Sequence, residues 1–287
     1  MYAITGITGR VGGAAARALL GRGENVRAIV RSTDKGRSWS EKGCDVALAA
    51  IDDAVALTKA FAGADGVFLM TPPNYDPEPG FPQTRKILDA VSAAIKAARP
   101  GRVVYLSTVG AQASQENLLT NATIMEQGLR ALSVSVTLLR PAWFMENSAW
   151  DVAAARGGHM PSYLQPLDHP IPMIATADIG VVVADLLQQT WTGTRIVELE
   201  APRRYSANDI GRAFAETIGR RVHVEAVPCE TWEATFRSQG MKHPVPRMRM
   251  IDGFNEGWID FEGGAAEHWT GQTPLEAVVR NLVKAAD

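Results

Sequence analysis

The chain has 287 residues and a formal net charge of -2, with 46% apolar and 21% charged residues. These values fit one large α/β domain, or one and a half domains, with a substantial core, and they exclude a strongly basic surface for nucleic acid or membranes. Cys44 and Cys229 are too few for a disulfide framework, and no spacing is typical of a metal site. We expect a cytoplasmic protein without a bound metal, either a monomer or a homodimer.

Strands and helices alternate through the first half of the chain. Short apolar runs predict strands over residues 2–5, 25–30, 44–49, 65–70, 102–107 and 134–139. The segments between them predict helices over residues 10–21, 34–42, 54–61, 79–98 and 116–132. Apolar strands that alternate with helices are typical of a parallel sheet covered on both faces. We therefore expect residues 1–140 to form an α/β domain with a doubly wound parallel sheet of the Rossmann type.

The second half changes character. Residues 141–175 are rich in proline and aromatic residues and predict loops and short helices. Further helices are predicted by an apolar stripe after Thr176, by a Ser206 cap and by a capping box that begins at Thr273. We expect residues 141–287 to form a smaller, mostly helical α/β lobe that binds the substrate and packs against the first domain.

A glycine-rich loop follows the first strand. Gly6, Gly9 and Gly12 lie between a strand and a helix, which is the context in which such a loop binds a dinucleotide. Gly6 allows a sharp turn, Gly9 lets backbone N–H groups approach a pyrophosphate, and Gly12 lets the helix pack closely. The helix N-terminus attracts the anion. The alternative is a tight turn without a ligand.

The residue after the second strand indicates which dinucleotide binds. NAD-binding loops usually have a carboxylate at this point, which binds the ribose 2′-OH, whereas this chain has Arg31. A guanidinium pairs with a 2′-phosphate. The sequence therefore predicts NADP(H) as the cofactor, with a solvated basic turn as the alternative.

Several segments resemble the NmrA-like group of atypical short-chain dehydrogenases. They are ITGITGRVGG, AIVRS, AAIDD, VFLMTPP, VVYLSTVGA, TLLRPAWFMEN and GQTPLEAVVRNL, which together span nearly the whole chain. The resemblance implies a nucleotide site, whose residues are Gly6, Thr8, Gly9, Arg10 and Val11 in the loop, Arg31 near the 2′-phosphate, Asp52 beside the adenine, and Thr71, Pro72 and Ser107 along the nicotinamide ribose.

The proton donor typical of short-chain dehydrogenases is missing. Neither Tyr nor Lys occurs between Val109 and Arg140, where the Tyr-x-x-x-Lys motif would lie. Several NmrA-like reductases have a His four residues before a Glu, and this chain has Ala122 before Glu126. Glu126 is either the matching family residue or a solvated helix carboxylate. Ser107, without a basic neighbour, is assigned a positioning role, and the catalytic residues stay unknown.

Aromatic residues lie near the expected substrate cleft. The candidates for substrate binding are Tyr75, Phe81, Trp143, Phe144 and Trp150, some of which could instead pack the lobe. Planar apolar acceptors fit aromatic walls. We therefore predict an NADPH-dependent reductase that transfers hydride to a quinone, an azo compound, a triphenylmethane dye or an iminium ion. The alternative is a non-catalytic redox sensor that binds NADP(H) and signals to a partner.

Overall fold

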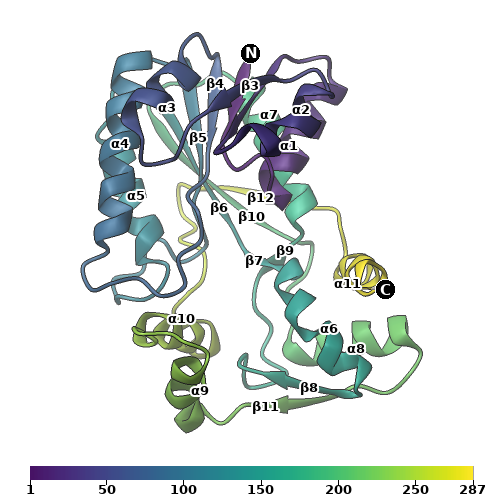
Figure 1. Cartoon of the computed structure of the whole chain (residues 1–287). Coiled ribbons are helices and arrows are strands. Elements are labelled where there is room, and N and C mark those ends of the chain that lie inside the picture. The colour runs from purple at the N-terminus through teal and green to yellow at the C-terminus, as the bar shows by residue number, and fades with distance from the viewer. Residues whose placement is uncertain (287) are drawn as a thin grey trace.

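The computed structural model describes residues 1–286, and its centre is an eight-stranded sheet (Figure 1). In spatial order the strands are β12 (Glu267–Thr270), β10 (Thr194–Glu200), β6 (Ser135–Pro141), β5 (Arg102–Leu106), β4 (Gly66–Leu69), β1 (Tyr2–Ile4), β2 (Val26–Val30) and β3 (Asp45–Leu48). All neighbouring strands are parallel. The strand order reverses between β1 and β4, as in a doubly wound fold, so the predicted fold class is confirmed.

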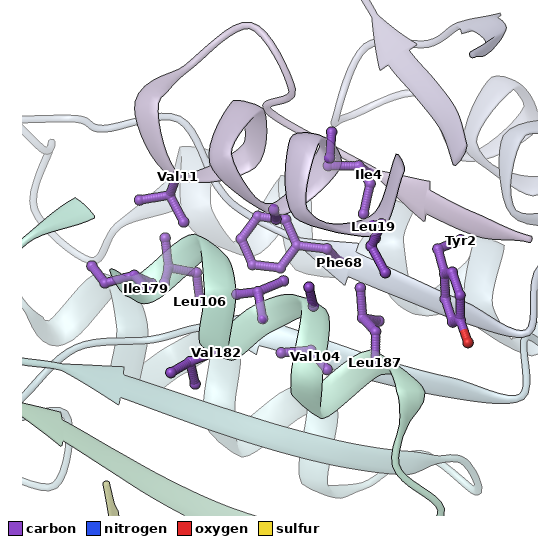
Figure 2. Close-up of a cluster of buried hydrophobic side chains, with 14 of the residues drawn as sticks. Tyr2, Ile4, Val11, Leu19, Phe68, Val104, Leu106, Ile179, Val182 and Leu187 are labelled. Carbon is purple, nitrogen blue, oxygen red and sulfur yellow. The ribbon is translucent and has the colours of Figure 1, made fainter. Parts of the chain in front are cut away.

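Helices cover both faces of this sheet because successive side chains of each strand point to opposite faces. α1 (Arg10–Gly21), α2 (Thr33–Ser40) and α7 (Thr176–Gln188) lie on one face. α3 (Ala54–Phe61), α4 (Pro82–Ala98) and α5 (Thr120–Arg130) lie on the other. Figure 2 shows the core of the first face, where Phe68 and Val104 of the sheet meet Leu19 of α1 and Leu187 of α7.

The lobe lies beyond the end of β6 and has a core of its own (Figure 1). Its elements are β7 (Trp143–Phe144), η1 (Met145–Asp151), α6 (Val152–Arg156), β8 (His159–Ser162), β9 (Met173–Ile174), α8 (Ala207–Ile218), β11 (His223–Ala226), η2 (Cys229–Thr231), α9 (Trp232–Ser238), α10 (Val245–Glu256) and α11 (Leu275–Ala285). The short strands form two parallel pairs, β7 with β9 and β8 with β11. Helices make up most of the regular secondary structure of the lobe. No helix within residues 1–286 is long and apolar enough to cross a membrane.

The large sheet extends past residue 140, where the sequence predicts the boundary between the two parts. β10 pairs with β6, and β12 pairs with β10, so two strands from the second half complete the large sheet. α7 also returns to the sheet and packs on α1. These elements belong with the dinucleotide-type sheet because their apolar faces are buried there rather than in the lobe. Whether the two parts are separate domains stays a prediction.

The helix boundaries show which local predictions were right. Ser206 caps α8 through a capping box with Asp209, as predicted for the cap. Thr273 does not cap α11, because its N–H and Oγ1 both bind the Asp178 carboxylate of α7, at 2.8 and 2.7 Å. α5 begins later than predicted, since the Asn117 side chain accepts the N–H of Leu119 in a turn that precedes the helix.

Candidate cofactor and substrate site

A cavity of about 490 Å³ lies at the carboxyl edge of the sheet. Its walls come from the start of α1, directly after the glycine loop, and from the loop after β4, the end of β5, the beginnings of α4 and α5, and η1. The position coincides with the reversal of strand order between β1 and β4, which is where open α/β sheets bind ligands. The fold therefore brings the predicted cofactor loop and the predicted substrate segments to one place.

Thr5 ties β1 and β4 together at this edge. Its Oγ1 donates to the carbonyl oxygen of Phe68 at 3.0 Å and accepts the N–H of Met70 at 2.7 Å. Thr5 is buried, so these bonds satisfy a polar group that would otherwise be costly to bury. The sequence analysis did not single out this residue, although a threonine that ends a buried strand is a usable signal.

The glycine loop has the geometry of an anion-binding turn. Gly6 adopts a φ of +60°, and its carbonyl oxygen accepts the N–H of Gly9 at 2.9 Å. A Cβ on Gly12 would lie 2.4 Å from that same oxygen, so α1 approaches the loop as closely as only glycine allows. Thr8 and Gly9 are exposed at the N-terminus of α1. The loop therefore presents backbone N–H groups and the positive end of a helix dipole to solvent.

The two arginines that follow β2 differ in their partners. Arg37 forms an ion pair with Asp34 at 3.7 Å. Arg31 is exposed, and no carboxylate within residues 1–286 pairs with it. Asp52, in the turn between β3 and α3, accepts a hydrogen bond from Lys86 at 2.7 Å, which holds the pKa of its carboxyl below the usual range. The placement of Asp52 beside an adenine stays a prediction.

The cavity gathers eight of the fifteen predicted site residues. Those that line it are Arg10, Val11, Thr71, Pro72, Tyr75, Ser107, Phe144 and Trp150. Gly6, Thr8, Gly9, Arg31 and Asp52 are not among the lining residues. Tyr75 and Trp150 are among the most exposed large side chains, and their rings meet edge to face with centroids 6.2 Å apart. They form an aromatic mouth to the cavity.

Two predicted substrate residues lie elsewhere. Phe81 is buried immediately before α4 and does not line the cavity. Trp143 packs edge to face on Phe254 of α10, with ring centroids 5.1 Å apart, as part of the lobe core. Both belong to segments rich in aromatic residues, and in each case burial of the apolar ring in the core is the stronger effect. Neither residue lines this cavity, and their contact with a substrate stays a prediction.

A buried charged network lies behind Ser107. The Oγ of Ser107 donates a hydrogen bond to Glu126 at 2.5 Å. The Glu126 carboxylate also accepts two hydrogen bonds from Arg140, at 2.8 and 2.7 Å. Glu126 and Arg140 are 3% and 2% exposed. Glu126 is therefore not a solvated helix carboxylate. Ser107 was expected to have no basic neighbour, but it donates a hydrogen bond to the Glu126 carboxylate. The sequence analysis missed this contact because Glu126 and Arg140 lie on different elements.

Tyr105 is a cavity residue that the sequence analysis overlooked. It is buried in β5, lines the cavity, and its phenol shares a hydrogen bond with the Thr71 side chain. Burial raises the pKa of the Tyr105 phenol strongly, which outweighs the lowering effect of Thr71. Tyr105 therefore keeps its proton and is a poor general acid. A tyrosine among the apolar residues of a buried strand was the available signal.

The remaining polar side chains of the wall act mainly as hydrogen-bonding groups. Glu146 accepts the N–H and the hydroxyl of Thr176 at the start of α7, at 3.0 and 2.5 Å. Asn74 donates to Gln83 at 2.8 Å. The wall at Ala122 is a methyl group. The arrangement can bind and orient a planar ligand.

A family model, a curated protein and solved structures each match most of this chain. The model of the NmrA-like family matches residues 2–255. Quinone oxidoreductase 2 of Escherichia coli strain K12 is 25% identical over 243 residues, which cover 84% of this chain and 82% of that protein. The structure of triphenylmethane reductase from Citrobacter sp. has a TM-score of 0.82 at 19% identity and covers 99% of both chains. The NADPH complex of an Escherichia coli NADPH-dependent quinone oxidoreductase has a TM-score of 0.80 at 21% identity and covers 100% of both chains.

Proposed function

Because the chain belongs to the NmrA-like family, we propose that it is an NADPH-dependent oxidoreductase that reduces planar, electron-poor acceptors. Quinones, azo compounds, triphenylmethane dyes and iminium ions form this class. The observation that carries the proposal is the cavity at the carboxyl edge, which reaches from Arg10 and Val11 at the start of α1, directly after the glycine loop, to Ser107 and to the aromatic mouth. Reductase names among the relatives support the same class of reaction.

The chain has the groups that an NADP(H) molecule requires. The close approach of Gly12 to Gly6 leaves the helix N-terminus open to a pyrophosphate. The unpaired Arg31 lies where a 2′-phosphate is expected, and the binding of NADPH by a structural relative supports this choice. When bound, NADPH supplies a hydride, which is two electrons with one hydrogen nucleus. Thr71, Pro72 and Ser107 would border the reactive end of the cofactor.

The substrate half of the cavity suits a flat aromatic molecule. A volume of about 490 Å³ lies within the usual range of roughly 300–1,000 Å³ for ligand pockets. Phe144, Tyr75 and Trp150 supply aromatic surface for stacking. Holding the acceptor against the cofactor can lower the barrier by about 7–11 kcal/mol through proximity and orientation.

The choice of electron-poor acceptors follows from the missing proton donor. Ala122 contributes no acid, and Tyr105 has a raised pKa. An iminium carbon that gains a hydride becomes part of a neutral amine and needs no proton. A quinone gains a hydride, spreads the negative charge over its ring, and takes a proton from water to become a hydroquinone. A plain ketone would leave an alkoxide in the cavity, which is costly without a donor.

The decisive experiment follows the absorbance of reduced nicotinamide. Purified protein is mixed with NADPH and, separately, with a quinone, an azo dye, a triphenylmethane dye and an iminium compound. The proposal expects oxidation well above the rate without protein for at least one acceptor. Binding of NADPH without oxidation by any of them would favour the redox sensor instead, a candidate that the lack of a proton donor also fits.

A further inference from the structure

Ser107 stands between the cavity and α5 and has a single hydrogen to donate. It lines the cavity, yet its Oγ lies 2.5 Å from Oε1 of Glu126. An ionised carboxylate has acceptor oxygens only, so the hydroxyl hydrogen of Ser107 is directed to Glu126. A ligand in the cavity therefore meets the lone pairs of this oxygen and not its hydrogen.

Arg140 holds Glu126 in this role. Its Nε and Nη2 atoms bind both carboxylate oxygens of Glu126, and its Nη1 lies 2.5 Å from Oε2 of Glu262. Burial lowers the pKa of Arg140, but the hydrogen bonds to the two glutamates raise it by more, so the guanidinium stays charged. A bidentate pair of this kind fixes the plane of the carboxylate. Glu126 therefore remains an acceptor toward Ser107.

We propose that Glu126 and Arg140 make Ser107 a hydrogen-bond acceptor toward the cavity, so that the site selects a bound group carrying an N–H or O–H donor. The inference rests on the proposed function, because it specifies which acceptors the reductase prefers. The donor can belong to the substrate, as in a protonated imine, or to the carboxamide or ribose of the cofactor. A carbonyl oxygen at this point faces another acceptor and is disfavoured.

Binding without turnover tests this acceptor role. The protein is saturated with NADP⁺ and titrated calorimetrically with protonated dihydroisoquinoline, which has an N–H, and with N-methyldihydroisoquinolinium, which has none. The wild type is expected to prefer the N–H compound, and Ser107→Ala to lower this preference on the order of tenfold. Thr108→Val changes a neighbouring hydroxyl of the same wall that is not bonded to Glu126, and the preference should persist.

Glu126→Gln tests the positioning role of the carboxylate. A glutamine can turn its N–H₂ toward Ser107 while its oxygen keeps a bond to Arg140, which frees the serine hydrogen for the cavity. The preference for the N–H probe should fall, and the affinity for tetralone, a bicyclic ketone that only accepts, should rise about tenfold. A purely structural role would weaken all three probes alike. If this variant does not fold, as judged by its melting curve, Ser107→Ala decides alone.

A separate titration of NADP⁺ identifies the source of the donor. If Ser107→Ala weakens NADP⁺ on the order of tenfold and leaves the probe preference unchanged, the cofactor supplies the donor and the acceptor role stands. If Ser107→Ala changes neither quantity, the inference is wrong, even when the protein reduces quinones. A clear probe preference in a protein that fails to oxidise NADPH with every acceptor tested would instead overturn the proposed function. The acceptor role of Ser107 would then still stand.

Discussion

Arg31 follows β2 directly, and Arg37 lies six positions later, within α2. Arg37 is paired with Asp34, whereas Arg31 has no carboxylate partner within the described residues. A guanidinium without a partner is available to a 2′-phosphate, and a charge-assisted hydrogen bond is worth roughly 1.5–3 kcal/mol. The preference for NADPH over NADH should therefore depend on Arg31 alone.

We predict that Arg31→Ala weakens NADPH binding about ten- to a hundredfold and leaves NADH binding nearly unchanged. Fluorescence or calorimetric titration of both cofactors measures this. Arg37→Ala is the matched control, and it should change neither affinity by much. Equal weakening of NADPH and NADH by Arg31→Ala would show that the residue does not contact the 2′-phosphate.

Asp151 illustrates the effect of burial on a single carboxyl. It ends η1 and is partly buried, and burial raises its pKa to about 7. The folded state therefore favours the protonated form. The contribution of protonated Asp151 to the free energy of unfolding is fully present below the unfolded pKa, near 3.9. This contribution is lost as the pH rises through the folded pKa of about 7. A neutral side chain of the same shape should stabilise the protein at alkaline pH.

Asp151→Asn is accordingly expected to raise the free energy of unfolding at about pH 8 by at most about 4 kcal/mol. The difference from the wild type should shrink toward about pH 4. Denaturant unfolding over this pH range measures it. Asp168→Asn, at an exposed position with no bonded partner in the described residues, should show little pH-dependent difference. A variant that is less stable than the wild type at alkaline pH would contradict this reasoning.

The sequence predicted the positions of cavity residues better than their contacts. Thr71, Pro72 and Ser107 follow strands, and parallel strands end at one edge, so topology alone brings them together. The contact of Glu126 with Ser107 and Arg140 depends on the rotation of α5 against β5 and β6, which has no local signature. The strand alternation offered a partial signal, since Tyr105 and Ser107 are two residues apart and share a face. Phe81 and Trp143 do not line the cavity, and sequence alone could not show this because aromatic residues occur in cores and cavities alike.

At the scale of elements, the contact of α1 with α7 sets the position of the glycine loop. A Cβ on Gly180 of α7 would lie 2.3 Å from Cβ of Ala14 and 2.7 Å from the backbone nitrogen of Ala15. The two helices can approach so closely only because Gly180 has no side chain. Since α1 carries the loop at its N-terminus, any separation of the helices would also move the loop.

Gly180→Ala is expected to destabilise the protein by roughly 1–3 kcal/mol through overpacking and to weaken NADPH binding. Gly21→Ala is the matched control, because Gly21 is also helical and nothing lies within 4 Å of its added Cβ. The control should be neutral or stabilising by up to about 1 kcal/mol. Thermal unfolding compares the stability of Gly180→Ala with that of Gly21→Ala. Equal melting temperatures would mean that α1 and α7 can move apart without loss of stability.

The loop after β4 is held against the lobe by one carboxylate. Asp76 accepts the N–H groups of Lys242 and His243, at 2.9 and 2.6 Å. Burial raises the pKa of Asp76, but these two bonds lower it by more, so the net pKa is below the usual range. The stabilisation from the clamp is therefore present above the unfolded pKa and lost as the pH falls through the folded pKa. The clamp positions Tyr75 at the mouth of the cavity.

Asp76→Ala should raise KM for the acceptor several-fold with a smaller change in kcat, because the mouth is loosened while the base of the cavity is untouched. Glu78→Ala removes an exposed carboxylate of the same loop and should leave KM unchanged. Steady-state kinetics with saturating NADPH provide the comparison. Equal KM values for wild type and Asp76→Ala would show that the loop needs no clamp.

The sequence predicted the alternating elements of the first half well because their apolar runs are long and regular. It did not reveal that β10 and β12 complete the sheet. β12 has only four residues and is largely exposed, so its apolar signal is weak. Thr273 does not cap α11 as predicted, because its N–H and its hydroxyl instead donate hydrogen bonds to Asp178 of α7. Such contacts depend on the arrangement of distant elements rather than on local sequence.

At the scale of the whole molecule, the cavity is a joint product of the sheet and the lobe. The part built around the sheet supplies Arg10, Val11 and Ser107, while Phe144 and Trp150 come from β7 and η1 of the lobe. The return of α7, β10 and β12 to the sheet fastens the lobe at several points of the chain. Orientation of a flat acceptor, rather than proton transfer, is what this architecture can provide.

The most direct test of this account is the ratio of kcat/KM for a quinone to that for a plain aliphatic ketone, measured by NADPH oxidation. Gly9→Val, which places a side chain where the pyrophosphate approaches, serves as the background and should keep its fold but lose NADPH binding. Because a positioned acid is worth about 10²–10⁴ in rate, the wild type is expected to reduce the quinone more efficiently than the ketone by a factor of that order. Comparable efficiency with the ketone, or equal rates in the wild type and Gly9→Val, would contradict it.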